Sequence, residues 1–319
     1  MTPPPEATRS RVRLRPLTQK DVPACREIFD AAQRELYGRL GQPWTPADGP
    51  IMDRLLSHLA ASDPELAWMA ASVSRGSPPL AFAMAVRRDR FCFLSFLFVR
   101  PEAQAAGLGR RLLERCLPPT DERVVRATCV DALQPISTGL YAAYGIVPRL
   151  PLFTLLGHSP AEGLPRLPRS IVALEFDRLV EADDGHARLA AAVEGIDREV
   201  CGFARAADHR YWRLDGRRGV LYTDRSSGRA LGYGYRTSGG RLGPVAVDAP
   251  GILPAVLRDL VEREQPPGRW QLLVPGVADA ALVPLLRAGM RFEGSPGLFC
   301  ASEASISYER YLPSSFALP

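Results

Sequence analysis

Apolar and polar positions change their period in a regular order along the first half of the chain. Residues 12–17 alternate as in a β-strand, and apolar residues then recur at helical spacing from Val22 to Tyr37. Thr18 followed by Asp21 is the signature of a capping box, which starts a helix. Continuous apolar runs follow. The pattern predicts a strand, two helices and three strands of a meander, over residues 12–17, 22–37, 51–60, 66–73, 80–86 and 91–99.

A short glycine-containing turn follows the last of these strands. It reads Gln104-Ala105-Ala106-Gly107-Leu108-Gly109 and separates the apolar run Phe91–Val99 from Arg110–Cys116, where apolar residues return at fourfold spacing. Glycine has no Cβ, so the backbone can turn tightly and approach a ligand closely. The free N–H groups and positive dipole end of the following helix suit a phosphate. The order strand, turn and helix therefore predicts an anion-binding site.

Two other interpretations of this turn stay open. Two glycines after a strand can open a dinucleotide-binding unit, although Ala105 and Ala106 leave no preceding glycine pair for the full fingerprint. A tight turn of small residues that binds no ligand fits the same letters. Arg110 and Arg111 can reach the phosphates of a ligand or form a solvated helix face.

The second half of the chain repeats the order of the first. We therefore predict an α/β (α+β) fold of two domains, residues 1–158 and 170–319, joined by a Pro-rich linker over 159–169. Each domain is expected to hold a mixed, mostly antiparallel sheet flanked by helices. The remaining expected segments are 123–130, 131–145, 149–155, 171–176, 186–200, 219–222, 230–237, 241–247, 253–262, 270–274 and 282–287.

Composition excludes several classes of function. The chain of 319 residues carries a formal net charge of +5, but it has no basic run of five or more residues, so we expect no nucleic-acid partner. No apolar run reaches the roughly 18 residues that span a bilayer, and Met1–Pro5 lack the apolar region of a signal peptide. The six cysteines and four histidines are scattered, which predicts reduced thiols, no metal and a cytoplasmic protein.

The glycine turn resembles the acyl-CoA loop of the GNAT superfamily of N-acetyltransferases. That loop has Arg or Gln, two residues, Gly, one residue, and then Gly or Ala, and Gln104, Gly107 and Gly109 match it. The resemblance implies acetyl-CoA as cosubstrate, a main-chain N–H of the preceding strand on the thioester carbonyl, and no metal. The residues that it assigns to acetyl-CoA are Leu97, Phe98, Val99, Gln104, Ala105, Ala106, Gly107, Leu108, Gly109 and Arg110.

A second stretch resembles the fourth helix of GNAT domains. Leu140, Tyr141 and Gly145 match its Leu-Tyr pair and the glycine that follows. The resemblance implies that Tyr141 protonates the departing CoA thiolate, whereas a core aromatic whose hydroxyl finds a partner is the other interpretation. GNAT domains often carry a Glu on the strand before the loop, and this chain has none there. Glu102, Asp48 or a chain of waters is left as the base.

The second half resembles the degenerate GNAT-like domains that follow an active one in some bacterial acetyltransferases, with Gly232-Tyr233 and Gly243-Pro244 as the shared features. Asp248 brings a negative charge to the position of the glycine loop, and Pro250 removes an N–H donor. We therefore expect one acetyl-CoA site, in the first domain.

The resemblance implies an enzyme that acetylates a primary amine of a small molecule or peptide, as a monomer or homodimer. A non-catalytic acyl-CoA sensor and an aminoacyl-type transferase built on two GNAT folds are the alternatives. Tyr37 and Trp44 fall in the segment that lines the acceptor site of GNAT domains, where they can stack on a substrate or belong to the core. The aromatic stretch Tyr308–Pro319 is expected to pack on the protein.

Overall fold

The computed structural model describes residues 12–46, 48–73, 76–119, 123–181 and 183–319, so Met1–Pro5 lie outside the described part. The chain divides into two compact units. The first ends at Arg87 and also takes in Cys92–Arg126, and the second comprises Arg88–Phe91 and Ala127–Pro319. The domain boundaries expected from the sequence stay a prediction.

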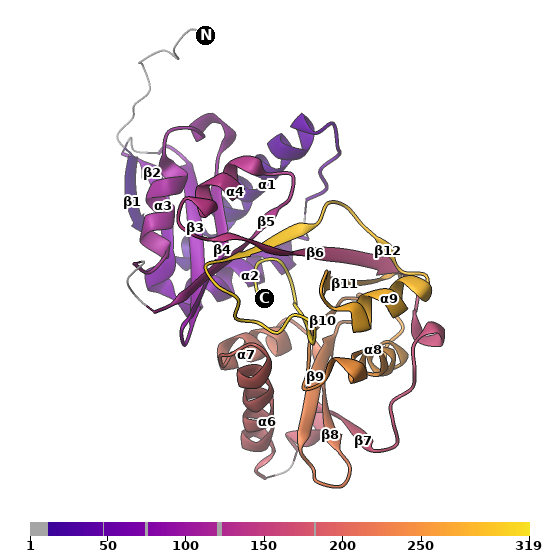
Figure 1. Cartoon of the computed structure of the whole chain (residues 1–319). Coiled ribbons are helices and arrows are strands. Elements are labelled where there is room, and N and C mark those ends of the chain that lie inside the picture. Colours follow the sequence, from indigo (N-terminus) through magenta and orange to yellow (C-terminus); the bar gives the residue numbers. More distant parts are fainter. Residues whose placement is uncertain (1–11, 47, 74–75, 120–122, 182) are drawn as a thin grey trace. The chain divides into compact units, whose positions relative to one another are not determined.

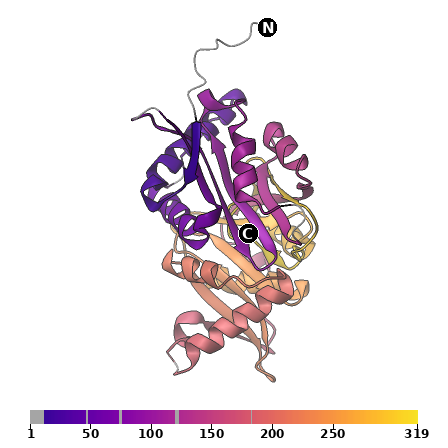
Figure 2. The same cartoon turned by 90° about the vertical axis from the view of Figure 1, so that its left-hand side faces the viewer.

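The first unit is a sheet with helices on both faces (Figures 1 and 2). Its strands follow the order β1-β2-β3-β4, and β1 pairs antiparallel with β2, as β2 does with β3. Helices α1 and α2 lie on one face, and α3 lies on the other (Figure 2). The elements are β1 (Val12–Pro16), α1 (Val22–Arg39), α2 (Gly49–Ser62), β2 (Ala67–Ser72), β3 (Pro79–Arg88), β4 (Phe91–Val99) and α3 (Leu108–Cys116).

The second unit contains a five-stranded antiparallel sheet with the order β14-β10-β9-β8-β7. Apolar side chains of α8 pack on this sheet and form its core together with β10 and β11. The elements are β7 (Ile171–Glu175), α5 (Phe176–Leu179), α6 (Gly185–Val200), α7 (Ala206–Leu214), β8 (Arg218–Asp224), β9 (Ala230–Arg236), β10 (Leu242–Val247), α8 (Leu253–Glu262), α9 (Asp279–Arg287) and β14 (Tyr311–Leu312).

Strands from distant parts of the sequence alternate elsewhere in the second unit. Strand β13 (Gly297–Ala301) lies between β5 (Val125–Asp131) and β6 (Val147–Gly157) and pairs antiparallel with both. Strand β6 also pairs with β11 (Trp270–Pro275) and with the two-residue β12 (Arg291–Phe292). Residues on either side of the Pro-rich stretch are therefore joined by main-chain hydrogen bonds.

The elements predicted from periodicity are confirmed, and the α+β class with them. Sequence reasoning missed α7, because Asp208 and His209 are buried on the helix and break its apolar stripe. It also missed α5, β12 and β14, which are too short to show a period, and β13, whose partner strands β5 and β6 lie far away in the sequence. The prediction that Tyr308–Pro319 packs on the protein is confirmed, since Tyr311, Leu312 and Leu318 are buried.

No helix in the described ranges is both long enough and apolar enough to cross a bilayer. The same residues contain no group of three potential metal ligands. All six cysteines are free thiols.

The predicted capping box at Thr18 is present and is reinforced by an ion pair. Asp21 accepts hydrogen bonds from the Thr18 main-chain N–H at 2.9 Å and from two Arg15 nitrogens at 2.6 and 2.8 Å. The hydrogen bonds from Arg15 lower the pKa of Asp21 to about 2, against the opposing effect of burial. This carboxylate joins β1 to the start of the first helix.

We predict that Asp21→Asn lowers the free energy of unfolding by about 1 kcal/mol at pH 7. The lowered pKa of Asp21 alone corresponds to about 2.6 kcal/mol of stability, and the partial solvent exposure of Arg15 reduces this contribution. Because the folded pKa lies below the unfolded value of about 3.9, this stability is present above pH 4 and disappears as the pH falls through 2. Urea unfolding between pH 2 and 7 measures it, with the exposed Asp177→Asn as control. If the difference in the free energy of unfolding between variant and wild type did not change across this pH range, the role of Asp21 would be refuted.

Candidate functional site

The end of β4 and the turn after it form a continuous structure in the first unit. Phe91–Leu94 are buried, whereas Leu97–Val99 are only half-buried. The Arg100 main-chain N–H donates to Leu80 O at 2.8 Å and so ties the end of the strand to β3. The chain then turns back, and Gln104 Nε2 donates to Val99 O at 3.3 Å. The predicted ligand residues on the strand and in the turn are thus held together locally.

The backbone of the turn adopts the left-handed region twice. Ala105 has φ +61° and Gly107 has φ +76°. This conformation costs about 1–2 kcal/mol for a residue with a Cβ, so Ala105 is strained and Gly107 is not. A Cβ built on Gly107 would meet no atom within 4 Å, so the glycine is required by its conformation and leaves open space beside it.

Main-chain N–H groups gather at this turn. Those of Ala105, Ala106 and Gly107 donate to no other described residue, and the first turn of α3 adds N–H groups that lack a helical partner. Leu108, Leu112, Leu113 and Cys116 are buried and fix α3 on the sheet, while Arg110 is exposed. Exposed N–H groups at the start of a helix favour an anion, and anion binding at this turn stays a prediction.

Aromatic side chains from α1 and the segment after it pack near Phe98 at the end of β4. The Phe29 ring lies 4.8 Å from Phe98 and 5.9 Å from Trp44, and Trp44 lies 5.3 Å from Tyr37. Tyr37 and Trp44 are half-buried, and the indole nitrogen of Trp44 is buried without a partner among the described residues. The two residues suggested for the acceptor site therefore contact one another and connect through Phe29 to the predicted reaction strand.

Asp48 and Glu102, the two residues considered as the base, have defined environments, and two further polar residues lie on β4 and α1. Asp48 Oδ1 accepts a hydrogen bond from the Ile51 main-chain N–H at 3.1 Å and caps α2, which is a structural role. Glu102 is exposed. Ser95 on β4 has a buried hydroxyl with no partner in the described ranges. Burial raises the pKa of Asp30 on α1, a carboxylate that the sequence did not single out.

Tyr141 lies on α4 (Pro135–Ala142) in the second unit. It is 5% exposed, and burial raises the pKa of its phenol, with a smaller contribution from the Cys300 thiol of β13. Its main-chain oxygen accepts from Ile146 N at 3.1 Å beyond the left-handed Gly145, which ends the helical segment. The hydroxyl makes no hydrogen bond within the described residues. A neutral phenol with an unpaired O–H can donate a proton, and its placement against the turn of the first unit stays a prediction.

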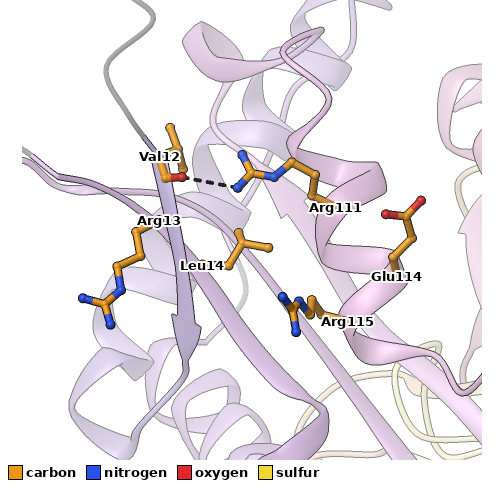
Figure 3. Close-up of a pocket in the computed structure, with 6 residues that line it drawn as sticks. All are labelled: Val12, Arg13, Leu14, Arg111, Glu114 and Arg115. Atoms are coloured by element: carbon orange, nitrogen blue, oxygen red, sulfur yellow. Dashed lines mark hydrogen bonds between the residues drawn. The ribbon is translucent and has the colours of Figure 1, made fainter.

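A pocket of about 450 Å³ lies between β1 and α3 of the first unit (Figure 3). Arg111 and Arg115 of α3 line it together with Leu14 of β1, and Arg111 Nη2 donates to Val12 O at 3.3 Å. The guanidinium of Arg115 also lies 5.3 Å from the Trp68 ring centroid. None of the residues predicted to bind acetyl-CoA lines this pocket.

A family model matches the first part of the chain. Residues 26–146 match the model of the acetyltransferase (GNAT) family, which spans both the glycine turn and Tyr141. No curated protein matches the chain.

Solved structures match over nearly the whole chain. A putative acetyltransferase from Pyrococcus horikoshii has a TM-score of 0.73 at 14% identity and covers 100% of this chain and 99% of its own. A GCN5-related N-acetyltransferase from Sphaerobacter thermophilus has a TM-score of 0.61 at 19% identity, and the match covers 94% of this chain and 98% of that protein. A tandem GNAT protein from the clavulanic acid biosynthesis pathway has a TM-score of 0.51 at 16% identity, and the match covers 92% of this chain and 100% of that protein. The expected fold of two tandem GNAT-like parts is confirmed.

Proposed function

We propose, since residues 26–146 belong to the GNAT family of acetyltransferases, that this chain transfers the acetyl group of acetyl-CoA to a primary amine of a small molecule or peptide. The observation that carries the proposal is the turn Gln104–Arg110, where unpaired N–H groups and a left-handed glycine stand between β4 and α3. We further place the enzyme in the bacterial cytoplasm, as a monomer or homodimer, without nucleic acid, membrane or metal.

Each part of the turn has a role in this proposal. The N–H groups from Ala105 to Arg110 hold the pyrophosphate of acetyl-CoA, and the open space beside Gly107 admits it. A main-chain N–H of Leu97–Val99 donates to the thioester carbonyl and stabilises the negative charge that develops on its oxygen. The aromatic side chains of Tyr37 and Trp44 face the acceptor.

The chemistry requires one proton donor. The amine nitrogen attacks the carbonyl carbon, the C–N bond forms, and the C–S bond breaks to release the CoA thiolate. Tyr141 donates its phenolic proton to this thiolate. The attacking amine loses one proton, which passes through solvent and restores the Tyr141 phenol. Burial favours the neutral phenol, so Tyr141 keeps its proton at physiological pH.

Thiol release distinguishes this proposal from the alternatives. We expect acetyl-CoA-dependent release of free CoA thiol when a panel of primary amines is supplied, measured with a thiol reagent. A non-catalytic sensor would bind acetyl-CoA and release no thiol with any amine. An aminoacyl-type transferase would turn over only with a charged tRNA.

We predict that Gly107→Val abolishes acetyl-CoA binding while the fold survives. The branched side chain disfavours the left-handed backbone and fills the space beside the N–H groups. Calorimetry measures the affinity, and circular dichroism measures the fold. Gly216→Val is the matched control, because Gly216 also has a positive φ and open space but lies in the second unit. Equal acetyl-CoA affinity in both variants would overturn the loop assignment.

We predict that Tyr141→Phe lowers the turnover number by about 10²–10⁴ and leaves acetyl-CoA affinity nearly unchanged. The ring still fills the buried site, so the variant loses only the proton donor. Steady-state kinetics and calorimetry measure the two quantities, and Tyr144→Phe, half-buried on the same segment, serves as control. Near-normal turnover would mean that Tyr141 only packs, and a parallel loss of affinity would mean that it positions the cosubstrate.

A further inference from the structure

The second unit contains a counterpart of the strand and turn that form the candidate site. In the first unit, β2, β3 and β4 are followed by a short 3-10 turn at Pro101–Ala103 and then α3. In the second, β8, β9 and β10 are followed by a 3-10 turn at Pro250–Ile252 and then α8. The end of β10, Val245–Val247, thus corresponds in position to Leu97–Val99.

Strand β10 pairs with β9 on one edge, and a later segment of the same chain pairs with its other edge. Strand β14 pairs antiparallel with it, placing Val245 opposite Leu312 and Ala246 opposite Tyr311. The Val247 main-chain N–H donates to Arg310 O at 3.1 Å. Because Val247 corresponds in position to Val99, residues 310–319 make here the type of main-chain bond that we propose acetyl-CoA to make with Leu97–Val99 in the first unit. We call residues 310–319 the tail segment.

The neighbouring strand leaves room for the tail segment. Strand β11 is bridged through Gln271 to Arg241, the residue that precedes β10, and Gln271 N donates to Gly240 O at 2.8 Å. A Cβ on Gly243 would lie 2.9 Å from Pro313 O, and a Cβ on Gly297 would lie 2.5 Å from the Phe316 ring. A side chain at either glycine would therefore clash with the tail segment.

A buried arginine holds the tail segment through its side chains and main chain. Arg205 is 1% exposed, and its Nη1 donates to the Tyr311 hydroxyl and to Pro319 O at 2.6 Å. Its Nη2 donates to Asp197 Oδ1 at 2.8 Å, so the buried charge is paired. The guanidinium also lies 4.8 Å from the Tyr311 ring centroid. Arg241 Nε adds a bond to Ser314 O at 3.3 Å.

We propose that the second unit is a peptide-binding groove and that the tail segment is its intramolecular ligand. The groove fits an extended peptide with aromatic and aliphatic side chains, which it binds by adding a strand to β10 and by contacts with Arg205. The proposal does not depend on acetyl transfer by the first unit.

Cleavage after folding tests the groove without removing the tail segment from the folding chain. A protease site is inserted between the exposed residues Glu303 and Ala304 of the intact protein. After cleavage, we expect the fragment 304–319 to stay bound through gel filtration and to exchange with a labelled synthetic peptide of the same sequence. Release of the fragment from a protein whose melting temperature is unchanged would overturn the proposal.

Variant peptides make the test specific while leaving the protein unaltered. A labelled peptide with Tyr311→Ala loses the contact with Arg205 and should bind at least about tenfold more weakly. A peptide with Glu309→Gln changes an exposed side chain and should bind as the wild type does. Equal affinities of all three peptides would refute the proposed groove.

The uncleaved protein supplies a second readout. Because the tail segment occupies the edge of β10, we expect the Val247 amide to exchange slowly with deuterium and acetyl-CoA to bind at one site per chain. Rapid exchange at Val247 would overturn the proposal. So would a calorimetric stoichiometry of two acetyl-CoA per chain.

Discussion

Main-chain hydrogen bonding between strands far apart in the sequence is the constraint on which the second unit depends. Strand β6 has β11 on one edge and β12 and β13 on the other, and β13 also pairs with β5. Each of these strands satisfies its N–H and C=O groups only when the later segment is present. Cutting the chain within the Pro-rich stretch would therefore leave open strand edges, which invite aggregation.

The two strand-turn-helix segments differ in how well they suit an anion. The first turn carries Ala105, Ala106 and Gly107 with N–H groups that no described residue accepts. In the second, Asp248 Oδ2 accepts from Arg229 Nη2 at 2.7 Å, and Pro250 supplies no N–H. A carboxylate in an ion pair and a missing donor both oppose a phosphate. The same topology thus presents free N–H donors in the first unit and a paired carboxylate in the second.

Buried polar groups give the second unit its specificity at an energetic cost. Asp197 is fully buried, and it pairs with Arg205 and with His209 Nε2 at 2.8 Å. The Tyr233 hydroxyl accepts from Arg205 Nη2 and extends the network, and Arg205 lowers the pKa of Asp197 despite burial. Such a network stabilises the fold only when every member is paired, because an unpaired buried charge is strongly destabilising. The tail segment supplies two of the partners of Arg205.

The sequence by itself determined the order of the elements and the location of the candidate site. Periodicity placed α1, α6 and α8 almost to the residue, and the run Gln104–Gly109 placed the turn between β4 and α3, because these features depend on neighbours in the chain. The tertiary structure alone decided that β13 inserts between β5 and β6, and that Tyr311 meets Arg205 beside β10. A strand of two residues has no period, and pairing between distant segments depends on which edges remain open after the rest has folded.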